Sequence, residues 1–597
     1  MVGIYGVING DDAIFYLDKE LYDSFENSHP NFKVQLKSYK GTDNYGIFEA
    51  DDFTILYYGN VFQGDYKIGI DKLVSLYIEW QEDVIHHIHG EFNLVLFNKP
   101  KNMCSIFVDS SGVLPLYYKK CGNTIVFSNS FPFVADSCAG VNTLNLKAVH
   151  NILRFGSTLS NDTLMSNIYS LKGGDLININ LETYEMVFSN HNSIEYNEIY
   201  NEAFHIEQVQ DVLRKAIIRR LHVDRVGVTL SGGLDSRLMI YLLHQEKQKQ
   251  AFDLKAFTWG QSYSEEQLIA KEVADILGVE LLSIELTPEN FLENRNEYSR
   301  LTGGMDIIFQ SYLLDVGKRI ARDVRVIFTG FTLDVLLGGT FINEELLYSN
   351  DIDFKNNFNK YEKMLKLNVF SEEELIGGLR PQFQSLVKEH HQDYINEVMK
   401  IETERVGNKV KESSFMNRDL NMVLFRNTIP AQFCEHVYPN TDIDFMKAIR
   451  QIPLEYKLDH KFYRKLLMTV SNEMADIKYH NTGLPVSVPT SYWSEGRAIE
   501  AKNEALIDNL FKETGIDFPY RHYYSNFNQW SRSNEYWTSL IKDMLLSEES
   551  IVSNQFFKYD YVSRIVQENF RWERNNQRKI SYLLTLESFF RTYKISL

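Results

Sequence analysis

The stretch Val226–Arg237 constrains the fold of this chain more than any other segment; it reads Val-Gly-Val-Thr-Leu-Ser-Gly-Gly-Leu-Asp-Ser-Arg. An apolar run of strand type leads into the turn Ser231–Gly233, and a helical pattern begins at Leu234. A strand, a glycine loop and a helix in this order direct backbone N–H groups and a helix N-terminus at one point, which makes an anion site. The two glycines allow a phosphate to approach closely and allow positive φ.

The other side chains of this loop indicate which anion it holds. Ser231 and Ser236 add hydroxyl donors, whereas Asp235 places a carboxylate beside the expected phosphate. That arrangement is favourable when Mg²⁺ bridges the two. The stretch lacks the G-x-x-x-x-G-K-[ST] pattern and the glycine spacing of a dinucleotide fingerprint. A plain turn with an N-capping serine is the alternative, and the apolar strand before the loop favours the phosphate site.

The segments around this loop alternate between strand and helix patterns. The expected helices are 203–221, 234–245, 264–278 and 312–323, and the expected strands are 226–230, 254–260, 280–286 and 324–330. Such alternation predicts a parallel α/β sheet. Residues 340–490 and 491–597 read as mostly helical.

The first 190 residues have a different pattern. Short strand-like runs separated by turn residues predict an antiparallel, two-layered arrangement of sheets, with a helix over 70–81. The first strand is expected at 2–8, with the terminus buried, and 191–203 is a polar linker. We therefore expect three parts, which are residues 1–190, 205–490 and 491–597.

Composition excludes several classes of protein. The net charge of −18 over 597 residues disfavours a nucleic-acid partner, which requires a basic face. No run of about 18 apolar residues and no signal peptide is seen, so no membrane partner is expected. The four cysteines form no C-x-x-C pair and indicate a reducing, cytoplasmic location.

The motifs together resemble a known family. Ser231–Ser236 is similar to the signature loop of the ATP pyrophosphatase superfamily, and the chain as a whole resembles the asparagine synthetase family. The segments that carry the likeness are GEFNLVLFNKPKNMCSIFVDSSGVLPLYY (90–118), FSNSFPFVAD (127–136), LSGGLDSR (230–237) and TGFTLDVLLGGT (329–340). β-Lactam synthetases and lasso-peptide cyclases are relatives of the same type.

This resemblance implies a fold and a set of site residues. It implies an α/β and α+β protein, with an N-terminal Ntn-hydrolase-like αββα sandwich of the class-II glutaminase type. A parallel-sheet ATP pyrophosphatase domain of the adenine nucleotide α-hydrolase type follows, with a helical C-terminal part. The implied ATP-binding residues are Ser231, Gly232, Gly233, Leu234, Asp235, Ser236, Thr258 and Gly330. Asp235 and Asp334 would bind Mg²⁺, and the implied catalytic residues are Asp235, Asp334 and Lys478.

The family's second acidic loop has lost both of its glutamates in this sequence. The usual S-G-E-G-S-D-E reads Thr329-Gly-Phe-Thr-Leu-Asp-Val335, so Asp334 is retained while the two glutamates are Phe331 and Val335. This difference puts aspartate as the substrate in doubt. The family also uses a late lysine to stabilise charge on the pentavalent phosphorus. Lys478 is the nearest candidate, and the alternatives are Arg426, Lys457, Lys465 and His480.

The glutaminase half lacks its catalyst. The family's nucleophilic cysteine is replaced by Val2, whose side chain has no nucleophilic atom. The loop whose arginine holds glutamine has Lys40, the family's N-G-E strand reads Tyr58–Asn60, and an acidic residue before the next helix is Gly69.

The resemblance therefore implies an ATP-dependent ligase that adenylates a carboxylate and passes it to ammonia or an amine, releasing AMP and diphosphate without glutaminase activity. Natural-product biosynthesis is one setting for such chemistry. Intramolecular amide formation, as in the cyclases, stays open, and so does an ATP-binding pseudo-enzyme. The carboxylate could be a small molecule or a peptide, and a homodimer is an open option.

Overall fold

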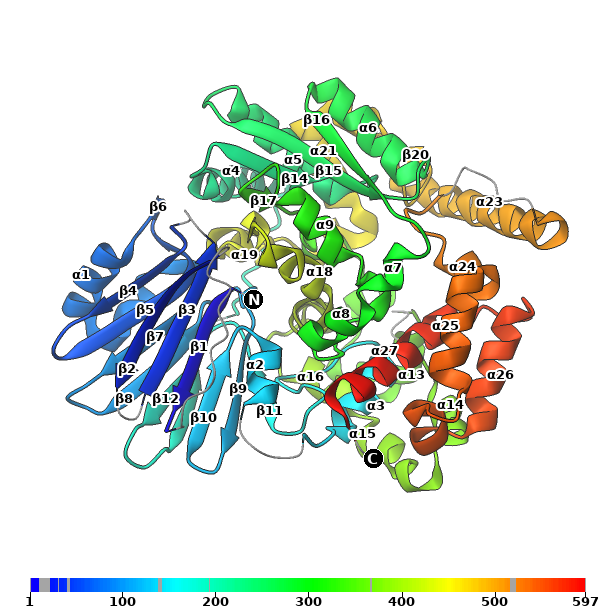
Figure 1. The fold of residues 1–597 in the computed structure, drawn as a ribbon. Coiled ribbons are helices and arrows are strands. Elements are labelled where there is room, and N and C mark those ends of the chain that lie inside the picture. The colour runs from blue at the N-terminus through cyan, green and yellow to red at the C-terminus, as the bar shows by residue number, and fades with distance from the viewer. Residues whose placement is uncertain are drawn as a thin grey trace.

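The computed structural model describes residues 2–9, 22–29, 32–39, 43–137, 142–192, 194–364, 368–515 and 522–595. Lys40 lies outside these residues. Two antiparallel sheets form one side of the molecule, a parallel sheet lies at the top, and helices from the end of the chain fill the opposite side (Figure 1).

The first sheet has the order β11-β9-β10-β1-β3-β2, and the second has the order β13-β12-β8-β7-β5-β4, with β6 paired to β5. Strands of the first sheet are β1 Gly3–Ile8, β2 Tyr22–His29, β3 Phe32–Tyr39, β9 Leu116–Cys121, β10 Thr124–Ser128 and β11 Ile168–Leu171. Those of the second are β4 Tyr45–Glu49, β5 Phe53–Gln63, β6 Tyr66–Lys67, β7 His89–Asn98, β8 Met103–Val108, β12 Asp175–Asn180 and β13 Met186–Asn190.

These two sheets face each other across an apolar layer. Ile4 and Ile8 of β1 share one buried cluster with Val95 and Phe97 of β7. Helix α1 (Ile70–Trp80) covers the outer face of the second sheet, and α2 (Phe131–Asp136) with α3 (Leu146–Phe155) covers the first. The result is the expected αββα sandwich, and Val2 is buried as predicted.

The parallel sheet has the order β16-β15-β14-β17-β18. Its strands are β14 Arg225–Thr229, β15 Asp253–Gly260, β16 Glu280–Glu285, β17 Val326–Phe328 and β18 Glu435–Val437. The first four match the predicted strands, whereas β18 lies in the stretch that we expected to be mostly helical. Three residues are too few for a period-2 pattern to show in the sequence.

Helices cover both faces of this sheet. Val226 and Val228 pack with α4 (Glu202–Arg220), α5 (Leu234–Lys247), α6 (Glu265–Leu277) and α21 (Lys461–Val470). Phe257 and Ile327 point to the other face, toward α8 (Arg295–Thr302) and α9 (Leu313–Ile320). Alternate residues of each strand are therefore buried on opposite faces, which explains their continuous apolar runs.

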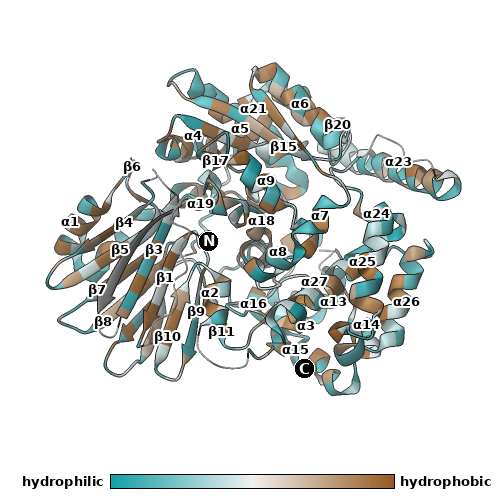
Figure 2. Cartoon of the chain, in the orientation of Figure 1, coloured by the Kyte–Doolittle hydropathy of each residue, from teal (hydrophilic) through white to brown (hydrophobic). Residues whose placement is uncertain are grey.

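The end of the chain is helical, as expected. Its helices are α23 Trp493–Thr514, α24 Phe527–Ser533, α25 Glu535–Leu546, α26 Tyr559–Phe570 and α27 Gln577–Tyr593. Buried residues of α25 and α27 join one apolar cluster with α2, α3 and α8, so these helices pack into the centre of the molecule. Helix α23 projects from the body and has a mixed surface, as Figure 2 shows.

Between residues 340 and 450 the chain forms short helices around a π-helical segment. This segment, η4, spans Phe415–Val423, and α17 Val406–Ser414 precedes it while α18 Phe425–Thr428 follows. Long π-helical stretches are rare and often lie at functional sites. Helix α19 (Ile443–Arg450) then packs beside α4.

A buried ion network joins the glutaminase-like half to the remainder of the chain. Arg220 at the end of α4 pairs with Glu91 of β7 at 2.7 Å and with Asp442 at 3.0 Å, and all three side chains are buried. Asp442 also pairs with Arg219 at 2.9 Å. Each charge has a partner, so burial leaves none uncompensated.

Replacing Arg220 tests this junction. Arg220→Met leaves the buried Glu91 without its cation and leaves Asp442 with Arg219 alone, and we expect a loss of about 3–5 kcal/mol of unfolding free energy. Urea unfolding followed by tryptophan fluorescence measures it. Lys101→Met is the control, since Lys101 and its partner Glu82 are exposed and such pairs contribute about 0–1 kcal/mol. Equal losses for the two variants would contradict the assignment.

Candidate functional site

The loop after β14 is ordered by its own serines. The Ser231 N–H donates to Ser236 Oγ at 3.0 Å, and the Gly233 N–H donates to Ser231 Oγ at 3.2 Å. Gly233 is the N-cap of α5 and offers no side-chain acceptor. The first N–H groups of this helix are therefore open to an anion.

The glycines of this loop do not use the positive φ that they allow. Neither Gly232 nor Gly233 is among the residues with positive φ. A Cβ on Gly232 would instead lie 2.7 Å from Cβ of His480, and the His480 N–H donates to Gly232 O at 3.2 Å. Gly232 is small because the chain around His480 lies directly against the loop.

The two predicted metal-binding carboxylates meet. The Asp334 backbone N–H donates to Asp235 Oδ2 at 3.2 Å, and the Tyr463 hydroxyl donates to Asp235 Oδ1 at 2.9 Å. Burial, followed by the charge of Asp334, raises the pKa of Asp235 well above its ordinary value. Gly330 makes the contact feasible, because a Cβ there would lie 2.9 Å from backbone atoms of Asp235.

A cavity of about 260 Å³, which we call the nucleotide cavity, opens beside the loop. Its lining residues are Thr229, Leu230, Ser231, Ser236, Thr258, Trp259, Glu266, Gln310, Tyr312, Leu313, Val316, Ile320, Arg426, Asn427, Pro430, His436 and Tyr524. The structure thus brings three of the predicted ATP-binding residues, Ser231, Ser236 and Thr258, to one cavity. Asp235, Asp334 and Lys478 are outside this lining.

Lys478 is engaged elsewhere. Its ammonium group forms an ion pair with Glu265 and lies 3.5 Å from Glu500. His522 Nδ1 lies 2.6 Å from the same Glu265. Glu265, Glu500 and His522 are also the one group among the described residues whose potential metal-ligand atoms lie within 4.8 Å of one another. The Lys478 ammonium already balances this acidic cluster.

The other candidates for the missing cation are dispersed. Lys457 is buried and donates to Ile449 O at 2.5 Å, while Lys465 is half exposed and pairs with Glu202. His480 is buried and stacks on His522 with ring centroids 4.2 Å apart. Only Arg426 of these residues lines the nucleotide cavity.

Three features of the site carried no recognisable signal in the sequence. They are the Tyr463 hydroxyl on Asp235, His522 on Glu265, and Tyr524, whose backbone O accepts from the Gln261 N–H at 2.8 Å at the rim of the cavity. His522 and Tyr524 follow the loop by nearly three hundred residues and belong to no motif. Only the folded chain brings them to the site.

At the glutaminase positions the structure shows packing and a contact between halves. Val2 lies in the apolar layer between the sheets, and Gly69 caps α1 without a side-chain acceptor. Asn60, at the family's glutamate position, donates through Nδ2 to Glu435 Oε1 at 2.6 Å. Gly59 adopts φ +114, where a Cβ would lie 2.0 Å from Glu91 O.

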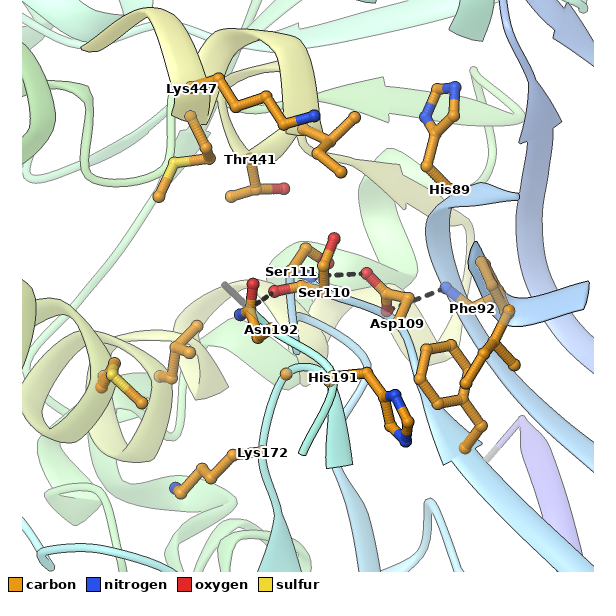
Figure 3. Close-up of a pocket in the computed structure, with 18 of the residues that line it drawn as sticks. His89, Phe92, Asp109, Ser110, Ser111, Lys172, His191, Asn192, Thr441 and Lys447 are labelled. Atoms are coloured by element: carbon orange, nitrogen blue, oxygen red, sulfur yellow. Dashed lines mark hydrogen bonds between the residues drawn. The ribbon is translucent and has the colours of Figure 1, made fainter. Parts of the chain in front are cut away.

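A second cavity, of about 240 Å³, lies between the two halves (Figure 3). Asp109 shapes one wall by accepting N–H groups of Ser111 at 2.7 Å and Phe92 at 3.1 Å. Burial raises the pKa of this carboxyl to about 7. Lys447 extends across the cavity from the opposite half. Asp109, which the family pattern retains, therefore builds a turn at the boundary.

The fold and the site define a class of protein. An Ntn-type sandwich is joined to a parallel sheet that carries a phosphate-type loop and a facing acidic loop. The model of the asparagine synthase family matches residues 208–591, and that of the glutamine amidotransferase domain matches residues 68–189. The first match covers more than half of the chain, so this protein belongs to the asparagine synthase family.

Individual relatives are distant. The chain is 22% identical over 349 residues to the Bacillus subtilis asparagine synthetase [glutamine-hydrolyzing] 1, covering 54% of each chain. It is 29% identical over 201 residues to asparagine synthetase [glutamine-hydrolyzing] 2 of the same organism, covering 32% of this chain and 26% of the relative. The chain thus spans about half the length, or less, of these relatives.

A solved structure of glutamine phosphoribosylpyrophosphate amidotransferase from B. subtilis aligns with 49% of this chain and 92% of its own. The sequence identity is 11% and the TM-score is 0.22, so we draw no argument from it. Among the described residues, no helix has both the length and the apolar character needed to cross a membrane.

The Glu265 cluster predicts a pH dependence. Burial acts to raise the pKa of Glu265, but hydrogen bonds from His522 and Lys478 outweigh it and lower the pKa from 4.5 to about 2. A lowered folded-state pKa stabilises the fold above the ordinary value, and the contribution is lost as the pH falls from 4.5 toward 2.

We therefore expect wild type to melt at a higher temperature than Glu265→Gln near pH 6, with the difference shrinking near about pH 3. Thermal unfolding of both proteins across this range measures it. A difference that does not change with pH would contradict the role of the Glu265 charge.

Proposed function

We propose that this protein is an ATP-dependent amide synthetase that forms AMP and diphosphate. It adenylates a carboxylate and transfers the acyl group to ammonia or an amine supplied from outside. Membership of the asparagine synthase family supports the class of reaction. The observation that carries the proposal is the contact of the Asp334 N–H with Asp235, beside a serine loop on the nucleotide cavity.

We assign a different role to each of the three parts of the chain. Residues 1–190 form a degenerate glutaminase-like part, residues 205–490 hold the synthetase site, and residues 491–597 extend it and contribute Tyr524 to the cavity. The Ser231–Ser236 loop binds the phosphates through its N–H groups and hydroxyls. Thr258 and Gly330 lie at the ends of strands, at the edge where α/β sheets bind ligands.

The residues present fit a Mg²⁺ ion. Asp235 and Asp334 bring two carboxylates together, and burial, followed by the charge of Asp334, raises the pKa of Asp235. Hard oxygen ligands of this kind suit Mg²⁺. When bound, the ion would neutralise phosphate charge. The protein itself aligns the two reactants and excludes water, which supplies a large part of the rate enhancement.

The reaction balances in two steps. A carboxylate oxygen of the acid attacks the α-phosphorus of ATP, and the bond from that phosphorus to the bridging oxygen breaks, so diphosphate leaves with the electron pair. The amine nitrogen then attacks the acyl carbon, the bond to the AMP oxygen breaks, and the nitrogen loses one proton.

The acid need not be aspartate. Phe331 and Val335 occupy the positions of the family's two glutamates, and both side chains are buried in apolar clusters. The Phe331 ring packs against Tyr438 with centroids 5.9 Å apart. No acidic group from these two positions therefore faces a substrate amine, which favours an acid other than a free amino acid.

The metal pair predicts one variant. Asp334→Asn removes a ligand charge, and we expect acid-dependent diphosphate release to fall by about 10³-fold or more, because the loss acts on the phosphate that carries the developing charge. Thermal stability should hold or rise, since the repulsion with Asp235 disappears. Diphosphate release across a panel of carboxylic acids and a parallel melting curve measure both. Unchanged release would refute the metal role.

The glutaminase half predicts the nitrogen source. Because Val2 and Asn60 replace the nucleophile and the binding carboxylate, we expect no glutamate release from glutamine, with or without ATP and acid. Ammonium should support turnover instead. Val2→Cys is a matched variant, and we expect it to stay inactive because Asn60 and Gly69 are unchanged. Glutamate formation by wild type above the no-enzyme background would contradict the proposed absence of glutaminase activity.

A further inference from the structure

Arg426 occupies an unusual place for an arginine. It lies on α18, and among the described residues that line the nucleotide cavity it is the only lysine or arginine. Ser231 and Ser236 of the phosphate loop line the same cavity. Asn427, the next residue, accepts the Thr329 hydroxyl at 3.0 Å, which ties α18 to the end of β17.

A buried carboxylate holds this arginine in place. Arg426 Nη2 lies 3.5 Å from Asp306 Oδ1, and Asp306 is fully buried while accepting the Tyr298 hydroxyl at 2.6 Å. Burial acts against the charge of Arg426, but Asp306 outweighs it, so the pKa of Arg426 lies above its ordinary value. One third of the side chain, 33%, stays accessible. The guanidinium is thus anchored by one partner and open on the cavity side.

Lys478 is neither anchored by a single partner nor open to the cavity. Its ammonium is held by Glu265 and Glu500 and does not line the cavity. To reach a phosphate it would have to leave two carboxylates, both of which are buried and also paired with His522. Arg426 already lines the cavity and need not leave Asp306 to meet a phosphate.

We propose that Arg426, rather than Lys478, supplies the positive charge that meets the α-phosphate while the adenylate forms. This inference rests on the proposed function. As the carboxylate oxygen bonds to the α-phosphorus and diphosphate departs, negative charge builds on the equatorial oxygens. A guanidinium presents two parallel N–H groups to such oxygens and stays charged in a buried site. Asp306 is its positioning residue, and Lys478 fastens α6 to the β19 strand (Lys478–Tyr479) and α23.

Three variants test it, namely Arg426→Met, Arg426→Lys and the matched control Lys478→Met. In ATP–diphosphate exchange with the best acid, we expect Arg426→Met to lower kcat by about 10²–10³-fold with little change in KM for the acid. Arg426→Lys should recover part of kcat, and Lys478→Met should stay within a few-fold of wild type. ATP binding by equilibrium dialysis should weaken in Arg426→Met and not in Lys478→Met.

The opposite results overturn the inference. A larger kcat loss in Lys478→Met than in Arg426→Met would return the role to the lysine. A raised KM for the acid with unchanged kcat in Arg426→Met would assign Arg426 to the substrate carboxylate. A lowered melting temperature without rescue by Arg426→Lys would make it a structural partner of Asp306. If wild type releases no diphosphate with any acid, the proposed function fails. ATP affinities of the three variants that all equal that of wild type would refute the inference on Arg426 separately.

Discussion

The parallel pairing of β14 with β17 is the constraint on which the site depends. Three residue pairs join the two strands, from Val226 with Val326 to Val228 with Phe328. Parallel strands end at the same edge of a sheet, so the loops that follow them are neighbours in space. Asp235 and Asp334, 99 residues apart in the chain, consequently lie within one hydrogen bond of each other. Any side chain at position 330 would press against Asp235, because a Cβ there would lie 2.9 Å from the Asp235 backbone.

Carboxylates balance the cations that lie between and within the two halves of the molecule. Arg220 between Glu91 and Asp442 joins the two halves, and Lys478 is neutralised by the cluster around Glu265. Arg220 is buried and is matched to carboxylates, as burial requires, and the partly exposed Lys478 is matched in the same way. Arg426 differs, because its partner Asp306 lies on one side and a cavity on the other. A cation with spare hydrogen-bonding capacity beside a phosphate loop is suited to a ligand that arrives with negative charge.

In the glutaminase-like half, positions that carry catalytic or binding residues in the family make packing contacts and a contact to the other half. Its sandwich is intact, since strands β1 and β7 share one apolar layer that selection for packing alone can maintain. Asn60 now bonds to Glu435, and Asp109 forms a turn at the boundary cavity. Asn60, at the position of the family's glutamate, thus contacts the other half of the protein, whereas Asp109 accepts hydrogen bonds within its own half.

Much of the parallel sheet and its loop could be predicted from the sequence, because the signals for them are local. The apolar strand before Ser231 and the periodicity of α4, α5 and α6 follow from neighbouring residues, and so does the alternation that predicted the parallel sheet. Strand β18 was missed because it has three residues and its strand character arises only from pairing with β17. The need for glycine at position 232 was hidden for a similar reason, since Gly232 accommodates His480, which no local pattern could show.

The sequence by itself determined the fold class, the phosphate loop, the second acidic loop and the loss of the nucleophile at Val2, because each is a property of a short run of residues. Tertiary structure alone decided which cation faces the cavity. Lys478 and Arg426 are equally charged in the sequence, and only their partners separate them. Two carboxylates hold the first outside the cavity and a single one anchors the second on its wall. That difference depends on the contacts of Lys478 with Glu265 and Glu500 and of Arg426 with Asp306, and these partners are far apart in the chain.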